Sequence, residues 1–308
     1  MVERVLIIGA TGFIGQALCQ AFTQGGSRVR AVSRSGYSST LDVEEHVACD
    51  CTDPAELAGL LQDMDAVIYL AATSTPGSSA GRPVDEVTDN LTPLTALLEA
   101  LQANPTLPLI YFSSAGALYG EHPQLAATED TPPQPRSYHG AAKVAAEQFI
   151  HAWSQQFNGT ATILRPSNVY GPGQQERDGF GIIPKAFGCI LRGDPITIWG
   201  DGSAVRDYLY IDDLVALALM ALEQPLPGTV RTLNAASGEA VDLNELFAIA
   251  EWASGGTLER RYTNTRMVDA STVLISATKA YQTLGWKPHV PLKEGLKRTW
   301  LWFESTQH

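Results

Sequence analysis

The sequence predicts an α/β protein built on a doubly wound parallel sheet, with a smaller second lobe towards the C-terminus. Three observations lead to this fold class. Through the first ninety residues, short apolar runs rich in β-branched side chains alternate with amphipathic stretches. The apolar runs are nearly continuous, as expected of strands that are buried on both faces. After Gly171 this alternation gives way to loops rich in glycine and proline, short strands and separate helices, which marks the second lobe.

The individual elements follow from the spacing of the apolar residues. Parallel strands joined by right-handed crossovers place helices on both faces of the sheet. Strands are expected at residues 5–10, 28–33, 46–50, 66–72, 107–116 and 160–171, with helices between them at 15–24, 54–64, 90–102 and 141–157.

The composition is that of an ordinary globular protein. The chain has 308 residues, of which 44% are hydrophobic and 18% charged, enough for two lobes or one large α/β unit. The first residues, MVERVLIIGATG, carry two charges and then a short apolar run broken by glycine, too short for a membrane span or a signal peptide. We therefore expect a cytoplasmic protein without a membrane partner.

The charge and the cysteines narrow the possible partners. A net charge of -12 argues against nucleic acid, because binding to phosphate along a whole surface requires a basic face. The four cysteines, Cys19, Cys49, Cys51 and Cys189, include one close pair without a matching second pair or a histidine cluster. We expect reduced thiols and no metal site.

A glycine-rich turn follows the first strand. The apolar run ends in G-A-T-G-F-I-G, and a helix comes next. Gly9 allows a tight turn, Gly12 lets the backbone approach a pyrophosphate, and Gly15 permits close packing of helix on sheet. The N-terminus of the helix would face the anion. Although such glycines can serve packing alone, the strand, turn and helix in register predict a dinucleotide site.

Further motifs extend this pattern across nearly the whole chain. They are LAA at 70–72, S-S-x-x-x-x-Y-G at 113–120, LRPSNVYGP at 164–172, WGDGSAVRDYLYIDDL at 199–214 and LGWKP at 284–288. Together with the glycine turn they resemble the extended short-chain dehydrogenase/reductase family, and within it the nucleotide-sugar epimerases and dehydratases. The resemblance implies a Rossmann-type domain over residues 1–166, to which about 207–236 return. A substrate-binding lobe for the sugar nucleotide would then comprise 167–206 and 237–308.

The resemblance also implies that the end of the second strand selects the cofactor. In the family, an acid there binds the ribose hydroxyls of NAD, whereas an arginine accommodates the 2′-phosphate of NADP. Here Ser33 replaces the acid and Arg34 follows it. A guanidinium binds phosphate through two hydrogen bonds and a carboxylate would repel it, so NADP is favoured and NAD stays possible. The alternative is that Arg34 is a solvated loop charge.

Other cofactor contacts are implied residue by residue. Asp50 matches the family residue that contacts the adenine amino group, and the alternative is that it caps the following helix. The remaining implied contacts are Gly9, Thr11, Gly12, Phe13, Ile14, Gly15, Cys51, Leu70, Ala71, Ala72, Asn90, Lys143 and Pro166.

The expected partner is a nucleotide-diphosphate sugar. By resemblance, Arg206 grips its pyrophosphate and Asn168 lies near the same phosphates, where fixed donors are needed. The structural alternatives are an ion pair from Arg206 to Asp207 or Asp212, and a turn role for Asn168. Trp199 and Tyr208 are expected in the core rather than against a base. The loops at 73–81 and 174–182 match no specificity pattern.

The stretch SYHGAAK, residues 137–143, departs from the family at the catalytic tyrosine. In the family, a tyrosine exchanges a proton with the sugar hydroxyl and a lysine lowers the pKa of that tyrosine. The family pattern is P-x-S-x-Y-G-x-S-K. Aligned to it without gaps, residues 135–143 put Lys143 on the lysine and His139 on the tyrosine. Tyr138 falls one position earlier, turned about a hundred degrees from the helix face that His139 and Lys143 share.

The family's serine or threonine seat is altered as well. Counting from the Y-G pair, this seat falls on Ala115, with Ser113 and Ser114 just before it. If the strand continues through these residues, its side chains alternate between faces. Ser114 then needs a bulge or twist to replace residue 115, and Ala117 offers nothing polar on the shared face.

Three hypotheses for the site follow. His139 is the acid/base, since imidazole accepts a proton at neutral pH without the strong pKa shift that tyrosine needs. Alternatively, a bulge after Pro135 brings Tyr138 into the site with help from Ser114. In the third hypothesis the site has decayed, and the protein binds a sugar nucleotide without turning it over.

The resemblance favours a nucleotide-sugar epimerase that acts at C4 through a transient 4-keto sugar. An NADPH-dependent 4-ketosugar reductase is the enzymatic alternative, supported by Ser33 and Arg34. A dehydratase would need acidic residues where this chain has Gly116 and Ala117. By analogy alone, the helices that include residues 90–99 and those after Lys143 are expected to form a homodimer interface.

Overall fold

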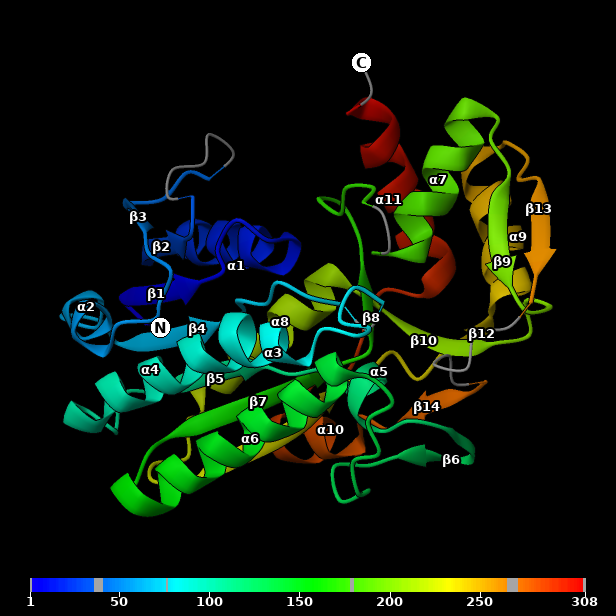
Figure 1. Cartoon of the computed structure of the whole chain (residues 1–308). Coiled ribbons are helices and arrows are strands. Elements are labelled where there is room, and N and C mark those ends of the chain that lie inside the picture. Colours follow the sequence, from blue (N-terminus) through cyan, green and yellow to red (C-terminus); the bar gives the residue numbers. More distant parts are fainter. Residues whose placement is uncertain (1, 36–40, 76, 178–179, 265–270, 307–308) are drawn as a thin grey trace.

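The core of the protein is a seven-stranded parallel sheet with the strand order β11-β7-β5-β4-β1-β2-β3 (Figure 1). The computed structural model describes residues 2–35, 41–75, 77–177, 180–264 and 271–306. Strand order reverses between β1 and β4, and in open α/β sheets ligands bind beyond the carboxyl ends of the strands at such a point. The strands of this sheet are β1 (Arg4–Ile8), β2 (Arg28–Ser33), β3 (Glu45–Ala48), β4 (Ala66–Tyr69), β5 (Leu109–Phe112), β7 (Ala161–Pro166) and β11 (Val230–Ala235).

Helices cover both faces of the sheet, which confirms the predicted doubly wound fold. Alternate residues of β1 enter different cores: Val5 and Ile7 pack with α1 and α8, whereas Leu6 and Ile8 pack with α2, α4 and α6. Because both faces are buried, the strands need the continuous apolar runs that the sequence shows. The helices are α1 (Phe13–Gln24), α2 (Pro54–Leu60), α4 (Thr92–Ala100), α6 (Tyr138–Phe157) and α8 (Ile211–Glu223).

The rest of the chain forms smaller sheets and further helices beside the carboxyl edge of the large sheet (Figure 1). β10 (Val205–Tyr210) pairs with β8 (Asn168–Tyr170) and β12 (Ala240–Asp242), and β9 (Ile196–Trp199) pairs with β13 (Arg260–Thr263). β6 (His122–Ala127) pairs with β14 (Val273–Ile275). The helices of this part are α7 (Ile182–Arg192), α9 (Leu243–Ser254), α10 (Thr278–Leu284) and α11 (Leu292–Ser305). The lobe boundaries given above stay predictions.

Three segments differ from the predicted elements. The single strand expected over 160–171 is divided into β7 and β8, which belong to different sheets. The strand expected over 107–116 ends at Phe112, and α5 (Ala115–Leu118) follows with Ser114 as its N-cap residue. No element was assigned to the stretch before residue 90, but it folds into α3 (Pro83–Glu86) and a π-helix (Val87–Leu91), and a 3-10 turn (Leu101–Ala103) follows α4. α3, α5 and the π-helix are too short for a periodic pattern to reveal them.

Helix α6, which carries the stretch 137–143, is fixed at both of its ends and in its middle. Ser137 caps its N-terminus, with its hydroxyl oxygen accepting a hydrogen bond from the Gly140 amide at 3.1 Å. Further along the helix, the buried Glu147 carboxylate binds the Arg165 guanidinium of β7, with Nη2 to Oε2 at 2.5 Å. Asn158 ends the helix in the left-handed conformation. The first turn of α6 is therefore held in a defined position beside the large sheet.

Among the helices of the described residues, none combines the length and the apolar character that crossing a membrane requires.

Candidate active site

The glycine turn joins β1 to α1 and packs closely against the chain after β4. Gly9 has φ +94°, and a Cβ there would lie 2.8 Å from the amide nitrogen of Ala71. A Cβ on Gly15 would lie 2.8 Å from the Cα of Ala10 and would overlap the carbonyl oxygen of Gly9. Space for a side chain is therefore absent at Gly9 and Gly15, whereas a Cβ on Gly12 would meet only the Gly9 carbonyl oxygen, at 3.3 Å. The N-terminus of α1 follows this turn directly, as is typical of a site for a dinucleotide pyrophosphate.

The other residues expected at the cofactor lie at carboxyl ends of strands in the same sheet. Leu70, Ala71 and Ala72 directly follow β4, and Pro166 is the last residue of β7. Thr11, Phe13 and Ile14 belong to the turn and the first turn of α1. Because parallel strands end at one edge of a sheet, the fold brings these segments together.

The end of β2 carries a hydroxyl where an acid would select NAD. Ser33 is buried, and its Oγ lies 3.5 Å from that of Ser35. Arg34 is exposed beside it. The residues that follow, 36–40, lie outside the described part of the chain.

Asp50 lies exposed just beyond β3. Its carboxylate accepts hydrogen bonds from the amide and hydroxyl of Thr52, and these bonds lower the pKa of Asp50. The helix cap is Asp53, which accepts from the Ala55 amide at 2.8 Å. The alternative that Asp50 caps α2 is therefore wrong, because Pro54 starts the helix three residues later than that role requires. Cys51 is buried and has φ 61°, and its role as a cofactor contact stays a prediction.

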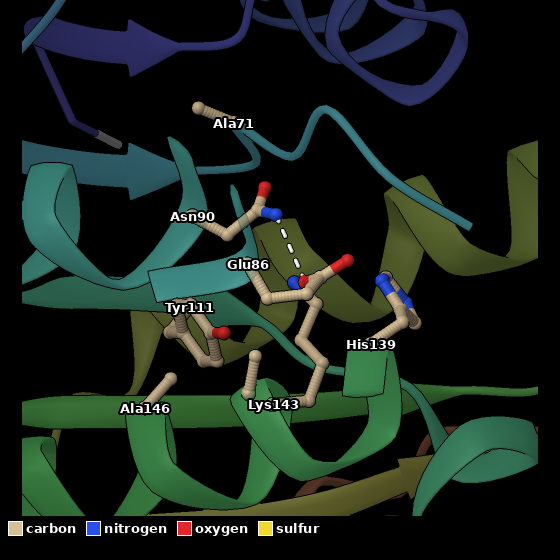
Figure 2. Close-up of a pocket in the computed structure, with 8 residues that line it drawn as sticks. Ala71, Glu86, Asn90, Tyr111, His139, Lys143 and Ala146 are labelled. Atoms are coloured by element: carbon tan, nitrogen blue, oxygen red, sulfur yellow. Dashed lines mark hydrogen bonds between the residues drawn. The ribbon is translucent and has the colours of Figure 1, made fainter. Parts of the chain in front are cut away.

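His139 and Lys143 lie on one face of α6 and line the same pocket (Figure 2). His139 is 9% exposed, whereas Tyr138 is 47% exposed and is not among the residues that line the pocket. The Lys143 ammonium donates to the carbonyl oxygen of Phe112 at 2.8 Å and lies 4.9 Å from the centre of the Tyr111 ring. The four-residue spacing thus selects His139 over Tyr138 as the neighbour of Lys143 in the pocket.

Burial sets the charge states of this pair. Desolvation, followed by the charge of Lys143, lowers the pKa of His139 to about 4. Burial also lowers the pKa of Lys143 to about 8, although the carboxylates of Glu147 and Glu86 act in the opposite direction. At neutral pH the histidine is therefore neutral and the lysine is protonated. A neutral imidazole beside an ammonium can accept a proton from a hydroxyl group.

Two polar residues were not anticipated from the sequence: Glu86, which lines the pocket, and Ser74, which contacts His139. Glu86, in α3, is only 3% exposed and accepts a hydrogen bond from Asn90 at 3.0 Å. Ser74, after β4, lies with its Oγ 2.9 Å from Nδ1 of His139. A glutamate four residues before Asn90 could have been noticed as a charge on a buried helical face, but Ser74 lies in a loop that carries no pattern.

Asn90, expected as a cofactor contact, has its side chain engaged within the protein. Its Oδ1 accepts from the Thr73 amide at 2.8 Å, and its Nδ2 donates to Ser74 and Glu86. A cofactor role for Asn90 stays a prediction.

The altered serine seat has a different local structure from the one expected. Ala115 is buried in the first turn of α5, and Ser114 precedes it with its side chain partly buried. The argument from alternating strand faces is wrong here, because β5 has already ended and Ala117 belongs to the short helix. The bulge that would bring Tyr138 into the site is absent from the described start of α6, where Tyr138 is the first helical residue and stays exposed.

The residues expected at the sugar-nucleotide phosphates lie on neighbouring strands. Asn168 of β8 pairs with Tyr208 of β10, two residues beyond Arg206. Asn168 is exposed, and its amide donates to the Asp207 carbonyl at 2.9 Å. Arg206 is partly exposed and donates to the Val205 carbonyl at 2.8 Å.

The structure also bears on the alternative partner of Arg206 and on the two aromatic residues expected in the core. The Asp207 carboxylate, one alternative partner for Arg206, is buried and accepts from Ser237 and Gly238. Tyr208 is buried as expected, but Trp199 is 45% exposed, so its assignment to the core was wrong. Trp199 lies on β9, a strand of a two-stranded sheet that the core does not enclose on both faces.

The fold and the pocket together define a class of protein. A glycine turn in which Gly9 and Gly15 have no room for a side chain is typical of a dinucleotide-binding sheet, and the chemistry of a buried His/Lys pair at the same edge suits proton transfer beside a cation. These are the parts of an enzyme that exchanges hydride and protons with a hydroxyl-bearing substrate.

Comparison with known proteins identifies the family. Residues 5–236 match the model of the NAD dependent epimerase/dehydratase family, and the chain belongs to this family. The chain is 31% identical over 312 residues to a UDP-glucose 4-epimerase of Mycolicibacterium smegmatis, covering 98% of this chain and 99% of that protein.

Solved structures show the same relationship. A UDP-glucose 4-epimerase from Thermotoga maritima, crystallised with UDP-glucose, is 30% identical, has a TM-score of 0.93 and covers 99% of this chain and 100% of its own. A UDP-glucose 4-epimerase from Thermus thermophilus in complex with NAD is 27% identical, with a TM-score of 0.88 and coverage of 98% and 99%. The relatives named here are nucleotide-sugar epimerases and match along their whole length.

Proposed function

We propose that this protein is a nucleotide-sugar 4-epimerase, with a UDP-hexose as substrate, in which His139 takes the place of the usual tyrosine. One observation carries the role of His139: it shares a buried pocket and a helix face with Lys143, while Tyr138 lies outside. The substrate class is supported by the relatives, which act on UDP-sugars and match the whole chain.

Four residues of the site have separate roles in the proposed reaction. His139, neutral at neutral pH, accepts the proton of the sugar 4-hydroxyl at its Nε2 atom and returns it after the sugar has turned. Lys143 keeps a positive charge beside the developing alkoxide and disfavours a lasting imidazolium. When bound, the nicotinamide cofactor supplies a reversible hydride acceptor for C4. Arg206 and Asn168 hold the diphosphate, so that only the sugar moves between the two half-reactions.

We also propose that NADP(H) binds more tightly than NAD(H). Ser33 leaves no carboxylate to repel a 2′-phosphate, and the exposed Arg34 is free to turn towards one. Calorimetric titration of both cofactors tests this, with Arg34→Ala expected to remove most of the preference. Equal affinities in the parent protein would refute it.

The Ser33 and Arg34 pair is also the observation that favours a second function. NADPH suits net reduction, so a reductase of 4-keto sugar nucleotides is the main alternative. A protein that binds the sugar nucleotide without turnover is the other.

A substrate panel separates these functions. The purified protein is incubated with UDP-, GDP- and dTDP-hexoses and with their 4-keto forms, and products are identified by NMR. Interconversion of C4 epimers without net cofactor consumption supports the epimerase. Stoichiometric oxidation of NADPH by a 4-keto sugar supports the reductase, and binding without any product supports the non-catalytic protein. Native mass spectrometry before the assay identifies any cofactor or sugar nucleotide that the protein retains.

A further inference from the structure

Three polar side chains form a series of hydrogen bonds that begins at the pocket wall and ends at the ring of His139. They are Glu86, Asn90 and Ser74, and we call the series the Glu86–Asn90–Ser74 chain. Asn90 Nδ2 donates to Glu86 Oε2 at 3.0 Å and to Ser74 Oγ at 3.2 Å. Ser74 Oγ in turn lies 2.9 Å from His139 Nδ1. Figure 2 shows Glu86, Asn90, His139 and Lys143 converging on the same pocket, with the Asn90–Glu86 bond as a dashed line.

The direction of the hydrogen bonds at Asn90 is determined by a backbone donor. The Thr73 amide can only donate, and its partner at 2.8 Å is therefore the carbonyl oxygen of the Asn90 side chain. The amide nitrogen of Asn90 must then face the other way, towards Ser74 and Glu86, and both of its hydrogens are used. Ser74 Oγ consequently accepts one hydrogen bond from Asn90.

Ser74 has one lone pair and its own hydrogen left for His139. Two arrangements satisfy the 2.9 Å distance. If the hydroxyl donates to Nδ1, the neutral ring carries its proton on Nε2 and cannot act as a base there. If Nδ1–H donates to the second lone pair of Ser74, the hydroxyl hydrogen of this half-buried serine is left to solvent, and Nε2 is unprotonated and ready to accept a proton.

The remaining contacts of His139 favour a ring that is held in place by this loop. The backbone amide of His139 donates to the hydroxyl of the buried Ser79 at 3.3 Å, so the loop that contains Ser74 also holds the main chain of the histidine. In the part of the chain that the structure describes, the protein makes no hydrogen bond to Nε2, so this nitrogen stays available to a ligand. Glu86 is buried on the wall of the same pocket, where it acts on Lys143 by raising the pKa of that ammonium.

We infer that Ser74, held by Asn90 and Glu86, is the positioning residue of His139: it accepts Nδ1–H and so keeps Nε2 as the proton acceptor. This inference rests on the proposed role of His139 as the acid/base. During the reaction, the proton of the sugar hydroxyl passes to Nε2 and back, and the Nδ1–H bond to Ser74 is retained throughout. The family's serine or threonine position is occupied here by Ala115, which has no hydroxyl group. Ser74 provides a hydroxyl group at this site, but it contacts His139 and acts through it.

The test combines spectroscopy with kinetics on the full-length protein carrying its retained or added dinucleotide. In ¹⁵N spectra of histidine-labelled protein, the His139 signals are assigned by comparison with His139→Ala. We expect the neutral ring to carry its proton on Nδ1 in the parent protein, and the Ser74→Ala protein to shift towards the Nε2–H tautomer. This readout does not depend on turnover, so it remains decisive even if the proposed epimerase activity is not found.

Kinetics measure the consequence for catalysis. Ser74→Ala is expected to lower kcat about 10- to 100-fold while KM changes less than about 3-fold, in the range typical of impaired general acid–base catalysis. Ser74→Thr keeps the hydroxyl and is expected to retain most activity. Ser78→Ala is the matched control, because Ser78 lies in the same loop but, among the described residues, hydrogen-bonds only to Thr75. In a His139→Ala background, Ser74→Ala should cause no further loss.

Two results would overturn the inference. An Nε2–H tautomer in the parent protein would show that Ser74 donates rather than accepts. A Ser74→Ala protein with the kcat and the ring spectrum of Ser78→Ala would show that Ser74 only stabilises the loop. Absence of turnover in the parent protein together with the expected tautomers would reject the epimerase proposal and leave the positioning of His139 by Ser74 supported.

Discussion

Two segments of this protein, the glycine turn at 9–15 and the start of α6 at 137–143, lie at the carboxyl edge of the same sheet but differ in what constrains their sequence. In the glycine turn, a Cβ on Gly9 or Gly15 would meet backbone atoms at 2.8 Å or closer, so the sequence there has no freedom. At the start of α6, the position next to Lys143 holds a histidine where the family pattern has a tyrosine, and the helix accommodates it without strain.

The difference reflects what each segment must supply. A pyrophosphate needs backbone donors at close range, and only glycine leaves the space. Proton transfer needs a group of suitable pKa at the right place, and more than one side chain can provide it once burial and neighbouring charges have adjusted that pKa. The glycines that the close packing requires are therefore retained, whereas the side chain that accepts the proton can be replaced by another.

The largest expected effect concerns His139, the residue at the family's tyrosine position. His139→Ala should lower turnover by about 10³-fold or more, because it removes the proton acceptor, while dinucleotide affinity changes less than about 3-fold. Steady-state kinetics and cofactor titration measure the two quantities. Tyr138→Phe is the matched control and should lower turnover by less than a factor of about 2, because Tyr138 does not line the pocket. The opposite ranking of these two variants would make Tyr138 the catalytic residue.

The next largest effect concerns Arg206, the expected contact to the sugar nucleotide. Arg206→Ala is expected to weaken sugar-nucleotide binding by about 2 to 4 kcal/mol, as for removal of one partner of a desolvated charge pair. Dinucleotide affinity should stay nearly constant. Calorimetry with UDP-hexose and with the dinucleotide compares the two. If both ligands weaken together, Arg206 has a structural role.

The steric rule of the glycine turn can be tested by one methyl group. Gly15→Ala forces backbone atoms of Gly9 and Ala10 to move, at a cost of about 1 to 3 kcal/mol, so dinucleotide affinity should fall about 10- to 100-fold. Gly59→Ala in α2 is the control, because a Cβ there meets nothing within 4 Å and alanine favours the helix. An unchanged affinity in the Gly15→Ala protein would show that the turn can relax, and the contrast between the two segments would disappear.

The smallest effect is a pH dependence. His139, with a pKa of about 4, is in its accepting form throughout the neutral range, and Lys143, with a pKa of about 8, loses its proton above it. The kcat should therefore be flat from about pH 5 to 7 and fall about tenfold per unit above pH 8. In Lys143→Arg, residual turnover should not fall there, because arginine does not titrate in this range. A rate that rises through pH 8 to 10 would instead indicate a tyrosine as the base.

The same groups affect stability with a definite sign. The pKa of His139 is lower in the folded protein than its ordinary value of 6.5, so the unfolded chain binds the extra proton. The contribution of His139 to the free energy of unfolding is therefore complete above pH 6.5 and is lost as the pH falls towards 4, which urea unfolding at a series of pH values measures.

The sequence by itself determined the sheet, the glycine turn and the pairing of His139 with Lys143. Each of these depends on short-range regularities: apolar runs for strands buried on both faces, glycines where no Cβ fits, and a four-residue spacing that helical geometry converts into a shared face. Ser74, Glu86 and the hydrogen bonds that connect them to His139 were decided by the tertiary structure alone. Ser74 is 65 residues from His139 along the chain, and only the packing of the loop after β4 against the first turn of α6 brings their side chains together. The end of β5 at Phe112 and the exposure of Trp199 belong to the same category, because both depend on which neighbouring elements cover a short segment and not on the segment itself.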